Sequence, residues 1–291
     1  MPFLAPNMIG FLILYAVPII LSFAISFTSW SGIKKLDFLS IESWGKNFVG
    51  FQNYKNILVS EEFWQSLLHV GYFIMLYIPL MLVASLGIAA LLNKPRKGIA
   101  LYRVLFYIPV LASWVAGALI WRWVLDPQFG VVNELLAKIG IHGPAWLQNE
   151  NWAMPGIVLA SVWKDMGFYG LIFLGGLKSI NPEYNESAQI DGAGRVQIFF
   201  RITLPMLTPV IFFVLVISLI NSFMLFPQVL IMTEGGPHGA TQVILERIYT
   251  YGFRYYKMGY ASALSWLLFV IVFVLTYIQQ KLQKKWVIYD V

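Results

Sequence analysis

The chain has 291 residues, of which 59% are hydrophobic and only 12% charged, whereas soluble domains are about 45–50% apolar and about 25% charged. The net charge of +6 comes from basic residues dispersed among apolar runs, which disfavours nucleic-acid binding and fits the flanks of membrane spans. The absence of cysteine excludes disulfides and thiolate metal sites, and His69, His142 and His238 lack metal-ligand spacing.

Six apolar runs are long enough to cross a bilayer, which requires roughly 20 residues. They lie at about 9–30, 67–92, 104–125, 153–177, 206–232 and 260–279. The first run lacks a basic leader and contains Pro6 and Pro18, so we interpret it as a retained helix and not as a secretory signal. The sequence therefore predicts an all-α integral membrane protein with six transmembrane helices, in which residues 1–291 form a single domain.

The segments between these runs differ in their content of Lys and Arg. Ten occur in the 51 residues of 93–103, 178–205 and 280–291, and eight in the 90 residues of 31–66, 126–152 and 233–259. Because cytoplasmic loops carry the excess of Lys and Arg, we expect the first set and both termini in the cytoplasm. The outer segments 31–66 and 126–152 are rich in Trp, Asn and Gly and are expected to form short interfacial helices and loops.

The cytoplasmic segment 178–205 carries signals for a short helix. Asn181 is a favourable N-cap, and Pro182 at the first helical position loses no needed donor. The turn dipeptide Asp191-Gly192 predicts the end of this helix, and a second helical piece is expected over 195–203. A helix of about nine residues is marginal alone in water, so it requires packing against another surface.

The composition of this short helix leaves two interpretations open. Its small residues permit close approach of another backbone, and its carboxylates form an acidic edge. The segment is therefore either a helix–turn–helix offered to a partner beneath the membrane or an amphipathic interfacial loop without a partner. The residues concerned are Glu183, Glu186, Ser187, Ala188, Asp191, Gly192 and Ala193.

The same segment resembles the EAA motif of the membrane subunits of bacterial ATP-binding-cassette importers. The resemblance rests on the spacing E-x-A-x-x-D-G-A from Glu186, followed by F-x-x-I-x-L-P-x-x-x-P from Phe199. A second block, TEGGP at 233–237 with GYASA at 259–263, is similar to the carbohydrate-importer branch and its maltose-type first permeases. Ser187 departs from the usual alanine, a change between two small residues.

This resemblance implies a coupling helix between the fourth and fifth spans, with the seven residues named above docking on an ATPase. The implied partners are a companion permease, two cytoplasmic ATPase subunits and an extracellular or periplasmic sugar-binding protein, all at the bacterial cytoplasmic membrane. No cofactor is expected in this chain, because ATP and Mg would be bound by the ATPase subunits. The nearest approach to a phosphate loop, residues 175–179, lacks the glycine before lysine, so the chain is expected to be non-catalytic.

Polar and aromatic residues inside two runs are candidates for a substrate path. Charged residues within spans are costly and usually face a protein interior or a wet cavity. Each candidate is either a substrate contact or a structural link between helices, and the sequence leaves both interpretations open. The candidates are Trp163, Lys164, Asp165 and Tyr169 in the fourth run and Asn221, Ser222, Phe223 and Phe226 in the fifth.

Three other function classes fit the sequence less well than an importer permease. An ion-gradient-driven secondary transporter would carry repeats and acidic residues within its spans, and here only Asp165 qualifies. A membrane enzyme would require a polar catalytic cluster, which is not evident, and a scaffold is disfavoured by the specific EAA pattern. The hypothesis is therefore a permease subunit of an ATP-driven importer for a sugar or oligosaccharide.

Overall fold

The structure, a computed structural model, describes residues 4–33, 45, 47–94 and 97–288. Within these ranges the regular structure is helical, and the only extended pairing is the isolated bridge between Thr28 and Phe48. Predicted loop positions at 34–44, 46 and 95–96 lie outside the described residues. The chain divides into two compact units, Met1–Leu68 with Gln242–Phe273 (unit 1) and His69–Thr241 with Val274–Val291 (unit 2).

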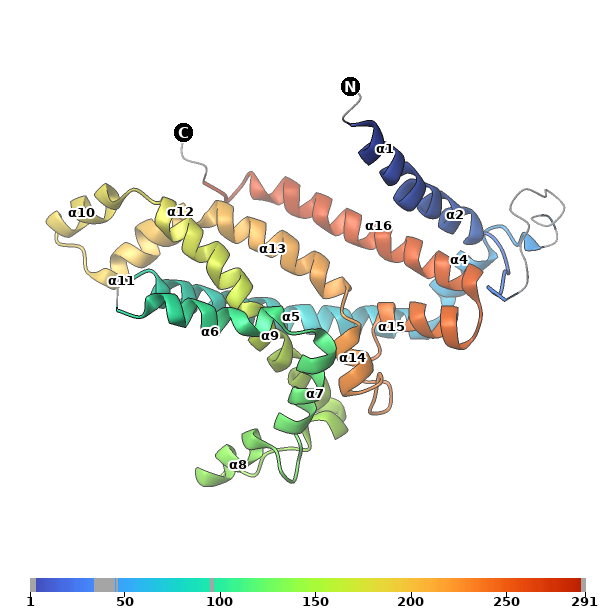
Figure 1. The fold of residues 1–291 in the computed structure, drawn as a ribbon, viewed down its shortest axis with the longest axis horizontal. Coiled ribbons are helices and arrows are strands. Elements are labelled where there is room, and N and C mark those ends of the chain that lie inside the picture. Colours follow the sequence, from blue (N-terminus) through green and yellow to red (C-terminus); the bar gives the residue numbers. More distant parts are fainter. Residues whose placement is uncertain (1–3, 34–44, 46, 95–96, 289–291) are drawn as a thin grey trace. The chain divides into compact units, whose positions relative to one another are not determined.

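Unit 1 combines the first helices with a late part of the chain (Figure 1). Its first span contains a π-helical turn just before Pro18, where the missing N–H of proline interrupts the regular helical ladder. The first parts of α5 (Glu61–Leu92) and α16 (Met258–Gln283) also belong to this unit. Its other elements are α1 (Ala5–Phe11), η1 (Leu12–Ala16), α2 (Val17–Ile25), α4 (Gln52–Val59), α15 (Ile244–Tyr249) and η4 (Thr250–Arg254).

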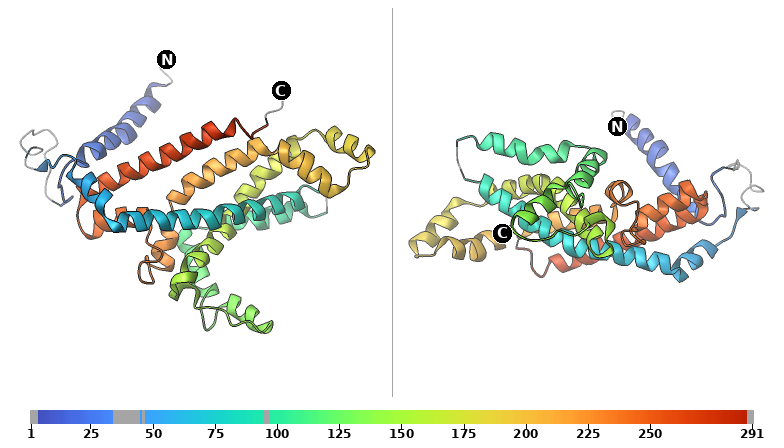
Figure 2. Two further views of the ribbon diagram at one scale, coloured as in Figure 1. Left: turned by 180° about the vertical axis from the view of Figure 1, so that it is seen from behind. Right: turned by 90° about the horizontal axis from the view of Figure 1, so that it is seen from below.

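Unit 2 contains the remainder of α5 and α16 and the helices from α6 to α14 (Figures 1 and 2). These are α6 (Ile99–Leu111), α7 (Trp114–Val124), α8 (Val131–Lys138), η2 (Trp146–Gln148), α9 (Glu150–Ser179), α10 (Pro182–Ile190), α11 (Arg195–Ile198), η3 (Phe199–Thr203), α12 (Leu204–Met206), α13 (Thr208–Phe223) and α14 (Pro227–Met232). In both figures α10 and α11 form a short hairpin that projects beyond the end of α9 and the start of α13.

The helical membrane architecture predicted from hydropathy is confirmed at the level of four to six candidate spans. Among the described residues, four unbroken helices are long and apolar enough to cross a membrane: Pro6–Ile25, Glu61–Leu92, Glu150–Ser179 and Met258–Gln283. Two further candidates are bent pairs, Ile99–Leu111 with Trp114–Val124 at 99° and Arg195–Met206 with Thr208–Phe223 at 64°.

The predicted span boundaries differ from the structure at three places. The first span ends at Ile25 instead of residue 30. The predicted span 104–125 is broken because Ala112 is extended and Ser113 starts a new helix, its Oγ accepting a hydrogen bond from the Ala116 amide at 3.2 Å. The predicted span 206–232 ends at Phe223, and a separate helix begins at Pro227, a favourable first helical residue.

Helix α9 is the central element of unit 2. It has 30 residues. In its apolar 18-residue stretch 61% of the residues are buried, the largest share among the four unbroken candidate spans. At 1.5 Å per residue it is about 45 Å long, enough to exceed a hydrocarbon core of about 30 Å. Segment η2 precedes its first residue and α10 follows its end, so these two regions lie at opposite ends of one continuous helix.

A glycine allows α9 to touch the backbone of α6. A Cβ atom on Gly167 would lie 1.9 Å from the carbonyl oxygen of Phe106, a distance that no side chain can occupy. Small residues at helix interfaces permit this close approach in membranes, where helix association depends on packing. Nearer the end of α9, a Cβ on Gly176 would meet Val210 of α13 at 2.7 Å.

The C-terminal segment of unit 2 folds back onto the start of α13. The amide of Ile288 donates to Thr208 Oγ1 at 2.9 Å, and the same hydroxyl donates to the Pro205 carbonyl at 2.7 Å. The Trp286 ring packs edge-on against Phe212 with centroids 6.1 Å apart. The tail therefore contacts α13 directly after the 64° bend at Leu207, and Thr208 links the two sides of the bend.

We predict that Gly167→Ala destabilises the protein, because its methyl group must displace the α6 backbone. Overpacking of this kind costs about 1–3 kcal/mol. The measurement is the apparent melting temperature of the detergent-solubilised chain, followed by the monodisperse fraction after heating. Gly175→Ala is the matched control on the same helix, since nothing lies within 4 Å of its added Cβ. Equal melting temperatures for the two variants would contradict the close contact.

Candidate functional site

Helix α10 begins where its sequence predicts. The Oδ1 atom of Asn181 accepts the amide of Glu183 at 3.1 Å, and its Nδ2 donates to the Glu183 carboxylate at 3.2 Å. Pro182 occupies the first helical position, where it has no lost hydrogen bond. An acidic side chain in this first turn also suits the positive end of the helix dipole.

Helix α10 ends in a glycine-dependent turn, as its Asp-Gly pair predicts. Gly192 has φ +82°, its amide donates to the Gln189 carbonyl at 3.0 Å, and the amide of Ala193 donates to Ala188 at 2.9 Å. These two bonds form a Schellman motif with glycine in the left-handed position. The motif reverses the chain into α11, whose last residue, Ile198, is buried.

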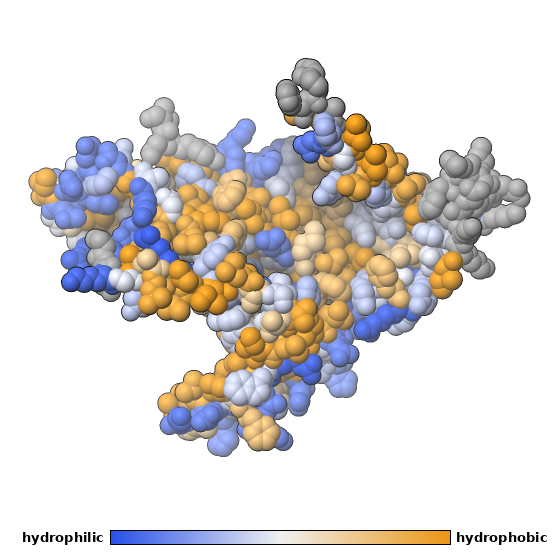
Figure 3. All heavy atoms as spheres, in the orientation of Figure 1, coloured by the Kyte–Doolittle hydropathy of each residue, from blue (hydrophilic) through white to orange (hydrophobic). Residues whose placement is uncertain are grey.

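Most of the predicted docking residues lie on the exposed surface of this hairpin. Glu183, Glu186, Ser187, Asp191 and Gly192 are exposed, Ala193 is half-buried and Ala188 is buried. Large apolar side chains are exposed beside the carboxylates: Ile190 at 86%, Val196 at 72% and Phe200 at 62%. In Figure 3 the α10 end of unit 2 is coloured mainly as polar, with isolated apolar spheres, whereas the region of α6 is broadly apolar. The hairpin thus presents mixed acidic and apolar chemistry.

Lys164, in the middle of α9, is buried and bound to the end of α6. Its Nζ donates to the carbonyls of Pro109 and Val110 at 3.1 Å each and of Ala112 at 2.6 Å. The ammonium also lies 5.4 Å from the centre of the Trp114 ring. The last carbonyls of a helix lack intrahelical partners and carry partial negative charge, so a cation is well placed there. Lys164 therefore caps α6 at the point where the broken span bends.

Asp165 and Tyr169 face the other neighbours of α9. The hydroxyl of Tyr77, in α5, donates to Asp165 Oδ2 at 2.6 Å, and Asn221 Nδ2, in α13, donates to the Tyr169 hydroxyl at 3.3 Å. Residues four apart lie on one helix face, so Asp165 and Tyr169 form one polar strip. Tyr77 and Tyr169 are buried, whereas Asn221 is exposed on the surface of the single chain.

The remaining path candidates differ in exposure. Trp163 is half-buried and packs edge-on against Trp121 at 6.0 Å. Ser222 and Phe223 are buried, and the Ser222 hydroxyl donates to the Ser218 carbonyl at 2.7 Å. Phe226 is half-buried at the start of α14. The structure thus brings Asp165, Tyr169 and Asn221 into one cluster. The four remaining candidates lie on the same helices or directly before α14.

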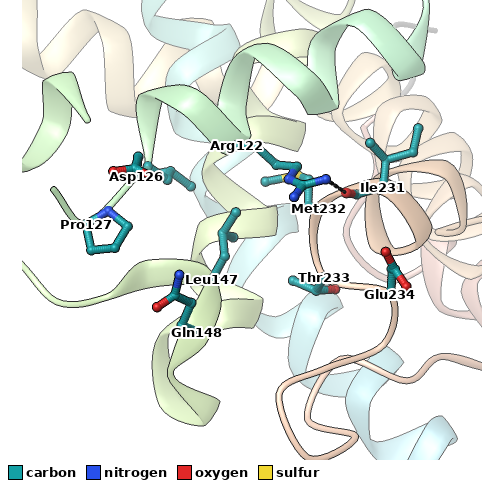
Figure 4. A pocket seen from close by; sticks show the side chains of 10 residues that line it. Arg122, Asp126, Pro127, Leu147, Gln148, Ile231, Met232, Thr233 and Glu234 are labelled. Atoms are coloured by element: carbon teal, nitrogen blue, oxygen red, sulfur yellow. Dashed lines mark hydrogen bonds between the residues drawn. The ribbon is translucent and has the colours of Figure 1, made fainter. Parts of the chain in front are cut away.

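A cavity of about 320 Å³ lies at the η2 end of α9 (Figure 4). Arg122 extends from α7 toward α14 and donates to the Ile231 carbonyl at 3.3 Å, while Glu234 lines the cavity from a loop and Gln148 from η2. The loop that follows is closed by a hydrogen bond of 2.7 Å between the hydroxyls of Thr233 and Thr241. Across the described ranges, no group of three or more His, Asp or Glu side chains is arranged as metal ligands.

Sequence reasoning missed the partners of these residues. Tyr77 lies in an apolar helix and carries no local signal that it binds Asp165, and no local signal indicates that Arg122 binds the Ile231 carbonyl. Pro109 and Ser113 are the only local signs of the α6 break, and neither indicates that Lys164 caps it.

Comparison with known proteins identifies related chains. Residues 57–288 match the family described as binding-protein-dependent transport system inner membrane component. The probable ABC transporter permease protein YesP of Bacillus subtilis (strain 168) is 41% identical over 293 residues, covering 99% of this chain and 91% of that protein.

Two solved structures have a similar fold. A bacterial ABC transporter involved in the import of the acidic polysaccharide alginate matches with a TM-score of 0.81 and 27% identity, covering 98% of this chain and 94% of that one. A bacterial alginate ABC transporter in complex with its alginate pentasaccharide-bound periplasmic protein matches with a TM-score of 0.80 and 26% identity, covering 100% and 95%.

We predict that Lys164→Met destabilises the chain, because three carbonyls at the end of α6 lose their donor. Each buried unsatisfied polar group costs about 1–3 kcal/mol, so the free energy of unfolding should fall by more than about 2 kcal/mol. The measurement is thermal unfolding in detergent. Lys178→Met removes an exposed lysine from the same helix and is expected to have little effect. If both variants melt together, Lys164 does not cap α6.

Proposed function

The chain belongs to the family of binding-protein-dependent transport system inner membrane components, and from this premise we propose that it imports a sugar or oligosaccharide as one permease of an ATP-driven complex. The relative of known structure that carries the acidic polysaccharide alginate supports a carbohydrate substrate. Family membership does not favour the ion-gradient-driven alternative.

The observation that carries the mechanical part of this proposal is the projecting α10–α11 hairpin. Its nine-residue helix is held at both ends by a cap and a Schellman turn, and it exposes carboxylates next to Ile190, Val196 and Phe200. Exposed apolar patches rimmed by polar groups mark protein interaction sites. The proposed partner is a cytoplasmic ATPase subunit, which binds ATP and Mg, so this chain transmits motion without performing the hydrolysis.

The proposed substrate path lies where this chain meets a companion permease. Asn221 is exposed on the single chain although it belongs to an apolar span, and exposed polar groups within spans usually face protein or a wet cavity. Its carboxamide, with Asp165 and Tyr169 behind it, supplies donors and acceptors for sugar hydroxyls. The two permeases together would enclose this polar strip between their six-span bundles.

The orientation follows from the basic segments. With 178–205 and both termini in the cytoplasm, the α10–α11 hairpin meets one of the two ATPase subunits, and the cavity beside Arg122 opens at the outer end of α9. A sugar-binding protein outside the membrane would deliver substrate at that end. The similar alginate transporter supports this proposal, because its structure is known in complex with a periplasmic protein.

We predict that a Glu186→Lys, Gly192→Pro double variant loses the ATPase. Proline cannot adopt φ +82° and lacks the amide that Gly192 donates to Gln189, while lysine reverses an exposed charge. Retention of the co-expressed ATPase on the tagged chain should fall at least about tenfold, which corresponds to about 1.4 kcal/mol.

The matched control for this double variant lies at the other end of unit 2. Glu134→Lys with Gly140→Pro repeats both changes on α8, where Glu134 is exposed and Gly140 has φ +78°. It should retain the ATPase as wild type does. Equal retention by the α10 double variant, or no ATPase on the wild-type chain, would contradict docking at α10.

We predict that Asn221→Leu lowers sugar uptake without loss of the ATPase. The change removes a carboxamide from the polar strip and leaves the distant hairpin intact. The measurements are uptake by proteoliposomes of the sugar that the wild-type complex accumulates, and ATPase co-purification. Phe213→Leu, which alters another exposed side chain of α13, is the control. Unchanged uptake by Asn221→Leu would remove this residue from the path.

A further inference from the structure

Unit 1 contains a second polar and aromatic cavity that the central path does not use. Its volume is about 370 Å³, at the lower end of the roughly 300–1,000 Å³ typical of small-molecule pockets. The aromatic part of its wall comes from Trp30, Tyr251 and Tyr260, all half-buried. The rings of Tyr251 and Tyr260 lie 4.6 Å apart with a tilt of 48°, so they meet as an angled aromatic wall.

The polar part of the wall offers both hydrogen-bond acceptors and donors. Asn53 uses both amide hydrogens on the carbonyls of Ser26 and Thr28 at 2.8 Å, which leaves its amide oxygen as an acceptor. Asn56 does the reverse, since its oxygen accepts from Gln52 at 2.7 Å and its NH₂ group remains as a donor. The pair therefore complements a ligand with several hydroxyl groups.

The walls are held by contacts that do not involve the cavity. The amide of Gly259 donates to the Trp30 carbonyl at 3.0 Å, and the amide of Lys257 donates to the Tyr251 carbonyl at 2.8 Å. The hydroxyl of Tyr251 donates to Glu62 at 2.9 Å, and burial together with this carboxylate raises the pKa of Tyr251. The tyrosine thus stays protonated, and its ring position is fixed before any ligand arrives.

The charge that the described residues bring to the cavity is positive. Among those that line it, Lys257 is the one charged residue, and its Nζ lies 6.0 Å from the centre of the Tyr251 ring. The nearby Glu62 carboxylate is already paired with the Arg247 guanidinium at 3.7 Å. Lys164, by contrast, has its ammonium engaged by backbone carbonyls, so Lys257 is the better placed of the two to meet an anion.

From this geometry we infer that the cavity is an outer subsite for an acidic sugar unit. A pyranose ring carries an apolar C–H face that an aromatic wall can cover, hydroxyls that carboxamides can bind, and in a uronic acid a carboxylate that Lys257 can pair with. This inference rests on the proposed carbohydrate importer and adds to it a second contact and a charge preference. In the proposed orientation the subsite lies on the outer side, where a sugar arrives.

The test uses the absence of cysteine from the chain. Ser29→Cys places one thiol at the exposed edge of the cavity, and Lys138→Cys places one on exposed α8 as a control. The full-length chain, co-expressed with its companion subunits, is reconstituted in lipid nanodiscs and labelled with a hydrophilic maleimide. Labelling rates are compared without sugar, with dimannuronate as the acidic probe and with neutral cellobiose.

Dimannuronate is expected to slow labelling of Ser29→Cys by about threefold at twice its dissociation constant, because protection follows 1 + [L]/Kd. Cellobiose should protect less, and Lys138→Cys should label equally under all conditions. Adding Lys257→Gln should abolish the advantage of dimannuronate, whereas Lys257→Arg should keep it.

Equal labelling of Ser29→Cys with and without both sugars would overturn the subsite, and equal protection by both sugars would overturn its preference for acids. ATPase retention measured on the same preparations separates this result from the proposed function. If the ATPase is retained and labelling is unaffected, the subsite alone is wrong. If wild type retains no ATPase, the importer assignment fails, whatever the labelling shows.

Discussion

An ammonium group inside a bundle of apolar helices is costly unless its hydrogens are bound, and Lys164 meets this constraint at the end of α6. The helix end has the complementary problem, because its last carbonyls have no intrahelical donors. The Lys164 ammonium donates to these carbonyls, so the hydrogen-bonding groups on both sides are satisfied. The 99° bend between α6 and α7 is therefore tolerated within a membrane. Gly167, less than one turn further along α9, brings the two backbones into direct contact on the same side.

With α6 fixed in this way, α9 links the two ends of unit 2. Its opposite side carries Asp165 and Tyr169 toward α5 and α13, and its last residue leads directly to the capped hairpin. A continuous helix of 30 residues is stiff on this length scale. We therefore expect α9 to transmit a movement of α10 along its length instead of bending locally. In the proposed importer this connection joins the ATPase contact to the polar strip of the path.

The parts of the fold that could be predicted are those specified by neighbouring residues. Asn181-Pro182 and Asp191-Gly192 define α10 through local capping, and hydropathy alone locates the unbroken spans. The break after Leu111 and the pairing of Tyr77 with Asp165 could not be predicted, because both depend on contacts between residues distant in sequence. The docking and path residues remain predictions, since position and exposure do not measure binding.

The exposed apolar side chains of the hairpin also bear on how the complex is assembled. In the proposed orientation, Ile190, Val196 and Phe200 would face the aqueous cytoplasm in any copy of the chain that had not yet bound the proposed ATPase. Chaperones and quality-control proteases recognise such unburied side chains, so an orphan subunit would be short-lived. The residues proposed to dock on the ATPase would thereby also keep the amounts of the subunits in the ratio that the complex requires.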